Sequence, residues 1–240
     1  MLVPNSIYIN QDKLPNFATT YNQKEIIENF YSKLDKKIKT IDVTDILIEN
    51  KDKYLYFKTD HHMTSLGTYL AYTKFCEIAN IQAEDLNNFE SKIVSTDFLG
   101  TFDSKAQIAN QEKDQIEIFT NQNNLEIKSA EYDNETTKSI FNEDFLTKKD
   151  KYSFFLNGNN AKVVVKTKIE NSKKLLVIKD SYAHIMAQFL CQNYEEIHFI
   201  DPRYYKASLT DYVVQNDITE ILFLYNVSNI LTDLGMLSIK

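Results

Sequence analysis

The sequence predicts an α/β protein whose parallel sheet is covered by helices. In the last third of the chain, residues 174–180, 195–201 and 220–226 are short apolar runs suited to buried strands. Residues 181–193 and 208–217, which separate these runs, have helical spacing. Alternating strands and helices with short connections imply that the strands are parallel.

The first 80 residues predict a similar alternation. Residues 6–10 and 40–47 are expected as strands on either side of a helix over 24–38, where apolar residues recur at helical spacing. An extended piece over 54–58 then leads into a helix that Thr64 can cap. The two ends of the chain are therefore expected to be built from the same kinds of element.

Residues 83–170 differ from the segments on either side. They contain alternating or β-rich runs separated by Asn-rich turns, and NGNN at 157–160 indicates a hairpin. No linker rich in Pro, Gly or Ser marks the edges of this region. We expect one domain over 1–240 with a β-rich antiparallel insertion or subdomain over 83–170.

The composition excludes several classes of function. A net charge of -7 without a run of lysines predicts no nucleic-acid partner. With only four glycines, the chain contains neither the dinucleotide-binding nor the P-loop motif. Cys76 and Cys191 lack the spacing of a zinc site or a disulfide framework. No apolar run reaches the length of a membrane span, and MLVPNSIYIN is typical of a strand inside a protein, so we expect Met1 to be a fragment edge.

Three side chains that follow expected strands have the chemistry of a nucleophile, a base and an acid. Ser181 follows 174–180, and Asp60 and His62 follow 54–58. Ligand-facing residues of a parallel sheet lie just past the carboxyl ends of its strands. Asp60 can hold one ring nitrogen of His62 and leave the other for Ser181, while backbone N–H groups after a strand can stabilise an oxyanion.

Other strand-end residues are candidates for binding a substrate carbonyl or a sugar. Arg203 is the only arginine of the chain, which otherwise has 26 lysines as its basic residues. Its planar guanidinium can donate two parallel hydrogen bonds to one partner, which a lysine ammonium cannot do. A structural ion pair with Asp201 is the alternative for this arginine. Tyr225 and Asn226, at the end of 220–226, are further candidates for substrate or oxyanion binding.

The remaining histidines are expected to have other roles. In an extended segment His61 would point away from His62, so we expect it to pack or to support the site. His184 is one helical turn beyond Ser181 and is expected either to line the pocket or to lie on a partly buried helix face. His198 alternates within a strand and is expected to be structural.

Three alternatives stay open at this point. Asp60 and Ser181 precede helices, where such residues most often serve as N-caps. A metal-dependent hydrolase could use Asp60, His61 and His62 as ligands, although adjacent histidines on an extended turn face apart. A glycan-binding or assembly protein with the same fold and no catalysis is the third alternative.

Several blocks of the sequence resemble the DHHW proteins of low-GC Gram-positive bacteria. They occur in order along most of the chain, as TDHHMTSLGTYLAY (59–72), DFLGTFDSK (97–105), FFLNGNNAKVVV, LLVIKDSYAH, HFIDPRYY and LFLYNV. The family is similar to SGNH-type hydrolases and to the alginate O-acetyltransferase group. The chain departs from the family pattern at Met63, which replaces a Trp, at Lys179, where Gly is common, and at His184, where Asn is common.

The resemblance implies a three-layer SGNH-hydrolase-like fold and matches Asp60, His62 and Ser181 to the catalytic residues and Arg203 to an active-site arginine. It further implies a serine-dependent transferase or esterase that acts on O-acyl groups, with acetyl as the expected group, of a cell-envelope polysaccharide or glycopolymer. No metal or organic cofactor is then needed. A membrane-bound acyl-donor protein is an implied partner, and the implied location is extracytoplasmic, with an N-terminal membrane anchor outside this chain.

Overall fold

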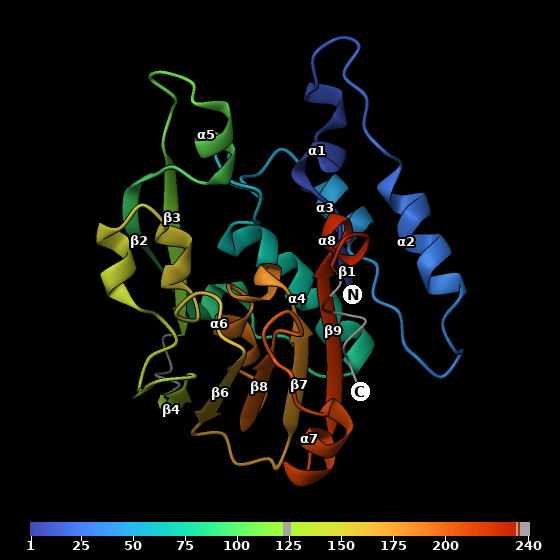
Figure 1. The fold of residues 1–240 in the computed structure, drawn as a ribbon, viewed down its shortest axis with the longest axis vertical. Coiled ribbons are helices and arrows are strands. Elements are labelled where there is room, and N and C mark those ends of the chain that lie inside the picture. The colour runs from blue at the N-terminus through green and yellow to red at the C-terminus, as the bar shows by residue number, and fades with distance from the viewer. Residues whose placement is uncertain (122–125, 234, 236–240) are drawn as a thin grey trace.

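A seven-stranded mixed sheet forms the centre of the protein, in a computed structural model that describes residues 1–121, 126–233 and 235 (Figure 1). Its strand order is β1-β9-β7-β8-β6-β4-β5. The strands are β1 (Leu2–Val3), β4 (Ile127–Glu131), β5 (Thr136–Thr137), β6 (Lys162–Thr167), β7 (Lys174–Lys179), β8 (Glu196–Ile200) and β9 (Glu220–Asn226). The three strands expected in the last third of the chain are therefore confirmed as β7, β8 and β9.

Strand β7 lies at the point where the connections of the sheet reverse direction. It pairs in parallel with β8 on one side and with β9 on the other, and β9 pairs in parallel with β1. The chain passes from β7 outward to β8 and then crosses to the opposite side of β7 to form β9. In open α/β sheets, ligands bind beyond the carboxyl ends of the strands at such a reversal, which here is where Ser181 follows β7.

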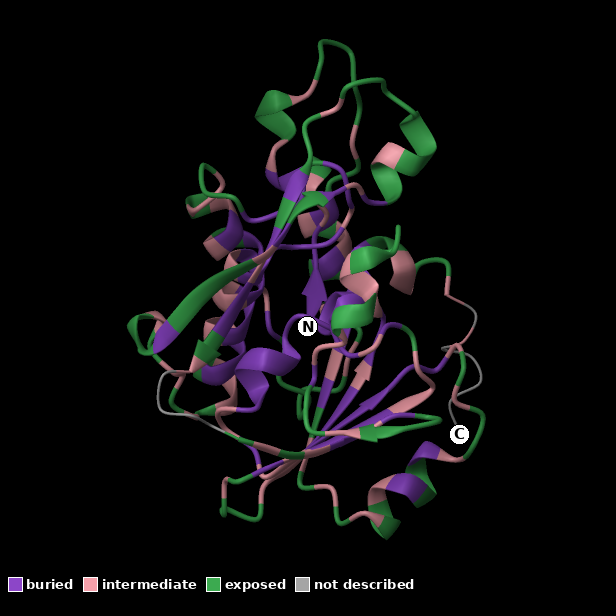
Figure 2. Ribbon diagram, turned by 90° about the vertical axis from the view of Figure 1, so that its left-hand side faces the viewer, coloured by how far each residue is buried: buried purple, intermediate pink, exposed green. Residues whose placement is uncertain are grey.

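Helices cover both faces of the parallel strands. On one face, Leu175 and Val177 of β7 share a core with buried residues of α4 (Ser65–Ala79) and α6 (Ala187–Leu190). On the other face, Leu176 contacts Leu209 and Tyr212 of α7 (Leu209–Gln215). Because successive side chains of a strand point to opposite faces, this division makes three layers, and Figure 2 shows the middle of the sheet as buried. The expected α/β class and three-layer arrangement are thus confirmed.

The antiparallel strands divide between two sheets. Strands β2 (Phe89–Phe98) and β3 (Asp114–Asn121) form a separate two-stranded sheet. Strands β4, β5 and β6 instead extend the main sheet, because β6 pairs antiparallel with β8 and β4 pairs with β6. The expected insertion over 83–170 thus supplies both a small sheet and one edge of the large sheet. That these residues form a subdomain stays a prediction.

The NGNN sequence makes a turn without forming the expected hairpin. Asn157 and Gly158 have positive φ, which asparagine and glycine tolerate, and the turn leads from the 3-10 helix η4 (Lys151–Phe154) into β6. No strand of the described residues precedes this turn directly. The prediction of a turn at 157–160 is therefore confirmed, and the prediction of a hairpin there is wrong.

The N-terminal elements are the least well predicted. The strand expected over 6–10 is the helix α1 (Ser6–Ile9), and the actual strand β1 ends before Pro4, whose missing N–H cannot continue a ladder. Half of the strand expected over 40–47 is helix α3 (Thr44–Glu49), and the Asp42 carboxylate accepts a hydrogen bond from the Thr44 N–H at the start of that helix (2.8 Å).

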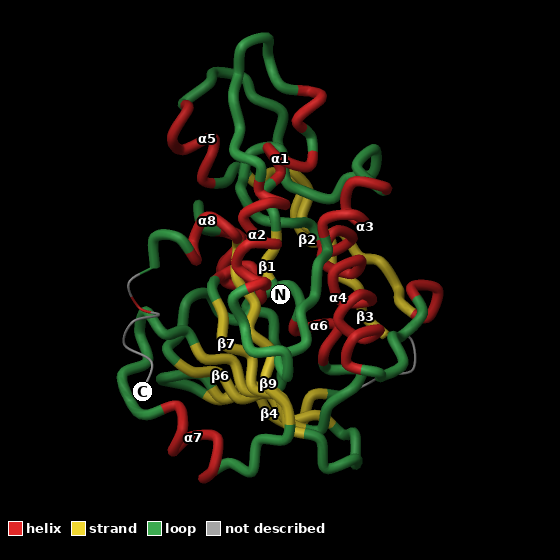
Figure 3. The backbone as a smooth tube through the Cα atoms, turned by 90° about the vertical axis from the view of Figure 1, so that its right-hand side faces the viewer, coloured by secondary structure: helices red, strands yellow, loops and turns green. Residues whose placement is uncertain are grey.

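Other helices differ from the expectations mainly in length. Helix α2 (Gln23–Ser32) is shorter than expected, whereas α4 begins where predicted, with the Thr64 side chain accepting from the Gly67 N–H. In Figure 3, α2 and α8 (Val227–Ile230) lie beside β1, while α3 lies beside α4. The segment 181–193 contains the 3-10 helix η5 (Ser181–Ala183) and α6. The other short helices are η1 (Gln11–Lys13), η2 (Leu86–Asn88), α5 (Thr101–Ala106) and η3 (Glu143–Thr147).

Within the described part of the chain, every helix falls short of the length and apolar character that crossing a membrane requires.

Candidate active site

The loop that carries Asp60 and His62 is tied down on both sides. The Tyr56 and Met63 backbones bridge across its base, where the Phe57 N–H donates to the His62 carbonyl (3.2 Å). The buried Asp114 carboxylate accepts from the N–H groups of Lys58 (2.9 Å) and Thr59 (2.7 Å) and from the Thr59 hydroxyl (2.6 Å). The loop is therefore fixed by non-local hydrogen bonds, although it is neither helix nor strand.

Ser181 is fixed by the residue before it. The Asp180 side chain caps η5 by accepting from the Tyr182 N–H (2.9 Å). Its other oxygen accepts from the Asn226 N–H at the end of β9 (2.9 Å) and from the Asn229 side chain (2.7 Å). Burial raises the pKa of Asp180, and these hydrogen bonds to its charged form oppose that rise. Asp180 therefore ties the end of β7 to the end of β9 and holds Ser181 between them.

Asp60, His62 and Ser181 form one hydrogen-bonded chain. Nδ1 of His62 lies 2.5 Å from Oδ1 of Asp60, and Nε2 lies 2.8 Å from Oγ of Ser181. Asp60 and His62 are only 2% and 5% exposed. The His62 N–H also donates to Asp60 Oδ1 (3.0 Å), so the backbone and the ring are held by the same carboxylate. Acid, base and hydroxyl thus lie in the order and at the distances that nucleophilic catalysis requires.

The electrostatics of the pair favour an ionised acid beside a neutral base. Burial alone would raise the pKa of Asp60, but hydrogen bonds from His61 and His62 outweigh burial and hold it below its usual range. Burial lowers the pKa of His62 to about 4, although the Asp60 charge opposes this shift. Near pH 7 the His62 ring is therefore neutral, with Nδ1–H directed to Asp60 and Nε2 able to accept the Ser181 proton.

Gly100 and Thr101, which we did not single out as individual residues in the sequence, complete the surroundings of Asp60. Oδ2 of Asp60 accepts from the Thr101 N–H (2.8 Å) and hydroxyl (3.1 Å). A Cβ atom at Gly100 would lie 2.2 Å from Cβ and 2.3 Å from Oδ2 of Asp60, so only glycine fits there. Since both residues belong to the DFLGTFDSK block and Gly100 is one of four glycines, the sequence did carry a signal for them.

The expectation that His61 points away from His62 is wrong. The two rings lie 3.8 Å apart at their centroids, and Nδ1 of His61 contacts the Thr101 hydroxyl (2.7 Å) and lies 3.4 Å from Asp60 Oδ1. The loop is not extended at this point, because the Phe57–His62 hydrogen bond closes it into a tight turn. His61 therefore covers one face of the His62 ring.

Asp60, His61 and His62 each offer a ligand atom, and all of these atoms lie within 4.8 Å of one another. Such close spacing is one requirement of the metal-dependent alternative. However, Asp60 Oδ1 and both ring nitrogens of His62 already join the hydrogen-bonded chain that ends at Ser181. That chain accounts for the closeness of the three residues, so we do not assign them as metal ligands.

The structure does not bring the expected substrate-binding side chains into this hydrogen-bonded chain. Nε and Nη2 of Arg203 donate to the two oxygens of Asp201 (2.9 and 2.6 Å), as in the structural alternative. Tyr225 is fully buried and packs on Phe223, and its hydroxyl has no hydrogen-bond partner among the described residues. A substrate role for either side chain stays a prediction.

Asn226 and the other two histidines are also buried. The Asn226 side chain donates to Val3 O (3.4 Å) and to Asn5, which ties β9 to the N-terminal segment. His184 accepts from Lys179 Nζ (3.0 Å), and burial lowers the pKa of that lysine to about 8. His198 contacts the Tyr212 hydroxyl (2.7 Å), so its expected structural role agrees with its surroundings. All three side chains are therefore held by contacts inside the fold, and a substrate role for Asn226 stays a prediction.

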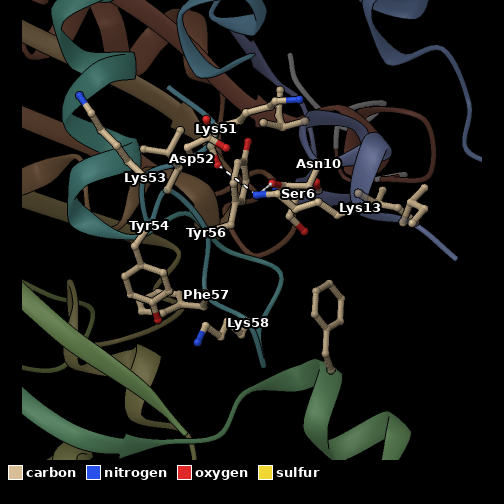
Figure 4. A pocket seen from close by; sticks show the side chains of 15 residues that line it. Ser6, Asn10, Lys13, Lys51, Asp52, Lys53, Tyr54, Tyr56, Phe57 and Lys58 are labelled. Atoms are coloured by element: carbon tan, nitrogen blue, oxygen red, sulfur yellow. Dashed lines mark hydrogen bonds between the residues drawn. The ribbon is translucent and has the colours of Figure 1, made fainter. Parts of the chain in front are cut away.

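A groove of about 590 Å³ lies beside the hydrogen-bonded chain. Figure 4 shows its walls, which come from the segment with Ser6 and Asn10 and from the segment between Lys51 and Lys58. Two residues of its lining link it to the candidate site: the Phe57 N–H donates to the His62 carbonyl (3.2 Å), and the Phe102 ring lies 6.3 Å from that of His61. None of Asp60, His62 and Ser181 lines this groove. It is therefore a neighbouring surface and not the site itself.

A comparison with protein-family models matches residues 1–200 to the model described as "DHHW protein". No curated protein matches the chain. Among solved structures, a DHHW family protein from Eubacterium siraeum DSM 15702 is similar over 98% of this chain and 78% of its own, with 25% identity and a TM-score of 0.85.

Two more distant solved structures share the fold. Bacillus cereus PatB1 with a sulfonyl adduct is similar over 100% of this chain and 83% of its own, with 19% identity and a TM-score of 0.82. The O-acetyltransferase domain of Pseudomonas putida AlgJ is similar over 98% of this chain and 77% of its own, with 10% identity and a TM-score of 0.54. The layered architecture is therefore maintained at low sequence identity.

Proposed function

Because this chain belongs to the DHHW protein family, we propose that it is a serine-dependent O-acyltransferase or esterase acting on a cell-envelope glycan. The observation that carries the proposal is the buried hydrogen-bonded chain from Asp60 through His62 to Ser181. The description of the AlgJ neighbour as an O-acetyltransferase domain supports acetyl as the acyl group. Such a role would place the protein outside the cytoplasm, with an acyl-donor protein in the membrane as its partner.

In this mechanism Ser181 is first acylated and then deacylated. Oγ of Ser181 attacks the acyl carbonyl carbon while its proton passes to Nε2 of His62. The bond from that carbon to the leaving oxygen then breaks, and His62 returns the proton to the leaving group. A sugar hydroxyl or water, deprotonated by His62, attacks the acyl-serine and regenerates the Ser181 hydroxyl. Asp60 keeps the His62 proton on Nδ1 throughout.

The negative charge that develops on the carbonyl oxygen needs hydrogen-bond donors. We assign one donor to the Ser181 N–H, the first amide of η5, which has no partner within that helix. Arg203 is the proposed second donor, because a guanidinium has five N–H groups and Asp201 accepts from only two of them. The buried positions of Tyr225 and Asn226 favour support of the site over contact with substrate.

Covalent labelling of Ser181 tests the proposal directly. An aryl sulfonyl fluoride should add its sulfonyl group to Oγ of Ser181 and release fluoride, because His62 removes the proton as Oγ attacks sulfur. Intact-mass and peptide analysis of the purified protein should show one label on Ser181, with loss of aryl acetate turnover in proportion. Ser181→Ala should take no label, and a chelator should leave turnover unchanged.

A wild-type protein that neither takes the label nor releases the aryl alcohol would contradict the catalytic proposal. The fold would then serve glycan binding or assembly without chemistry. In that case a cell-envelope polysaccharide should bind the wild type and Ser181→Ala equally well in a calorimetric titration.

The pH dependence of kcat/KM should have its acid limb near pH 4. The base must be neutral to accept the Ser181 proton, and burial places the pKa of His62 at about 4. Activity should therefore fall as pH drops through about 4 and stay level from there to neutral pH, where Asp60 is also ionised. Aryl acetate turnover between pH 3.5 and 8, with circular dichroism to monitor folding, measures this limb. A limb at the usual histidine value of about 6.5 would contradict the assignment of a desolvated His62.

A further inference from the structure

Tyr152 contacts both the proposed base and the proposed nucleophile. Its ring is stacked on that of His62, with centroids 3.5 Å apart and an interplanar angle of 7°. Its hydroxyl donates to the Ser181 carbonyl (2.9 Å). These residues are distant in sequence, so one side chain links two segments that only the tertiary fold brings together. Nothing in the local sequence of 151–154 distinguishes this tyrosine from the other fourteen.

The His62 ring is enclosed on both faces. Tyr152 covers one face, and the His61 ring lies 3.8 Å away at an angle of 38°. Tyr182 approaches from the side, with its ring centroid 5.4 Å from that of His62, and its hydroxyl donates to the His61 carbonyl. With its ring nitrogens bonded to Asp60 and Ser181, the imidazole has little freedom to rotate.

Tyr152 is itself firmly held. It lies in η4, is 6% exposed, and packs against Phe57 at 6.5 Å and Phe155 at 5.7 Å. Its ring also lies near the buried His184, with centroids 5.8 Å apart and an interplanar angle of 21°. Burial raises the pKa of Tyr152 well above its usual range, so its hydroxyl keeps the proton that it donates to the Ser181 carbonyl.

We propose that Tyr152 is the positioning residue of the site, holding the His62 ring by stacking and the Ser181 backbone by its hydroxyl so that Nε2 and Oγ stay within hydrogen-bond distance. This inference rests on the proposed function, since it assigns a role within that mechanism. Tyr152 acts through His62 and Ser181 and makes no contact with a substrate of its own in this role. The stack also keeps water from one face of the imidazole.

Two substitutions separate the two contacts. Tyr152→Phe keeps the stacked ring and loses the hydrogen bond to Ser181, so kcat for an aryl acetate should fall about 3- to 10-fold, the usual effect of one hydrogen bond. Tyr152→Leu loses both contacts, and kcat should fall about 100-fold, as expected when a reacting group moves by about 1 Å. The fall in kcat from the wild type to Tyr152→Phe then measures the contribution of the hydrogen bond. The further fall from Tyr152→Phe to Tyr152→Leu measures the contribution of the stacked ring.

The acid limb of the pH profile distinguishes positioning from general structural damage. Burial is the main cause that lowers the pKa of His62, so opening one ring face to water in Tyr152→Leu should raise that pKa from about 4 toward about 6.5. Tyr152→Phe should leave the limb near 4. The other titratable groups around His62 are Asp60, His61, Asp150, Tyr182 and His184, and both substitutions leave them in place.

Tyr132 provides a matched control. It is buried to a similar degree and its hydroxyl donates to the Ser139 carbonyl (3.1 Å), so it resembles Tyr152 in setting but not in its neighbours. Tyr132→Phe and Tyr132→Leu should change the melting temperature while leaving both the acid limb and the kcat of the folded protein unchanged. If Tyr152→Leu lowers kcat without moving the limb, as unfolding alone would, the positioning role is wrong.

An NMR titration keeps this inference separate from the catalytic proposal. The chain has only four histidines, so the His62 imidazole can be assigned with isotope-labelled histidine and a His62→Gln variant. The His62 pKa should rise in Tyr152→Leu and stay unchanged in Tyr152→Phe whether or not the wild type turns over an ester. An unchanged pKa in Tyr152→Leu would overturn the inference, whereas absent turnover alone would overturn only the proposed function.

Discussion

Ser181→Ala and His62→Ala should each lower kcat for an aryl acetate by about 10⁶-fold, and combining them should cost little more. The reason is that Oγ of Ser181 and Nε2 of His62, 2.8 Å apart, act as one unit, so that removing either disables the other. Steady-state kinetics of the two single variants and the double variant measure the effect. KM should change far less than kcat, since neither residue is proposed to bind the glycan.

Suitable controls are available at a distance from the site. Ser129 is a half-buried serine on β4, three strands away from β7 in the main sheet, and Ser129→Ala should keep wild-type kcat. His198→Gln tests another buried histidine, which contacts Tyr212. If the losses of kcat in Ser181→Ala and His62→Ala multiply in the double variant, the two residues act independently. That result would contradict the proposal that Ser181 and His62 act as one unit.

Gly100→Ala should lower kcat by about 10²- to 10⁴-fold although Gly100 has no functional group. The added methyl group would meet Cβ and Oδ2 of Asp60 at 2.2 and 2.3 Å, so the carboxylate must move away from its hydrogen bonds to Thr101 and His62. The upper value is the loss seen when the acid of such a triad no longer orients its histidine. Crowding should also destabilise the fold by about 1–3 kcal/mol.

Gly67→Ala separates these two effects. A Cβ at Gly67 would lie 2.2 Å from the Leu55 carbonyl oxygen, which is equally crowded but does not involve Asp60. Both variants should therefore melt at a lower temperature, measured by circular dichroism, whereas only Gly100→Ala should lose kcat and sulfonyl labelling once corrected for the folded fraction. Equal losses of kcat would assign the effect of Gly100→Ala to stability and not to Asp60.

The candidate site was predictable where its residues follow local rules. Ser181 follows a short apolar strand, so the topology of a parallel sheet was enough to place it at a strand end. The strand expected over 54–58 is wrong, because this piece makes only an isolated bridge between Tyr56 and Met63, yet Asp60 and His62 still lie beside Ser181. The structure places them in one hydrogen-bonded chain, and their catalytic role stays a proposal. Arg203 was selected by the same rule, yet it pairs with Asp201, because the rule gives the location of a side chain and not its partner.

The contacts around the site could not be read from local patterns. His61 was expected to face away from His62, but the turn closed by Phe57 and His62 brings the rings together. Gly100 and Tyr152 lie 40 and 90 residues from their neighbours Asp60 and His62 in the sequence. Periodicity and capping signals describe interactions within a few residues, so they contain no information on such pairs.

By itself, then, the sequence determined the α/β class, the strands β7, β8 and β9, the capped start of α4 and the strand-end position of Ser181, since apolar runs and caps act over short stretches of chain. Only the tertiary structure decided that β4, β5 and β6 extend the main sheet, that Leu2–Val3 and not 6–10 is the N-terminal strand, and that Tyr152 covers His62. These features depend on which distant segments bury one another's surfaces, and many pairings satisfy the same local pattern. The packing of the whole chain selects one of them.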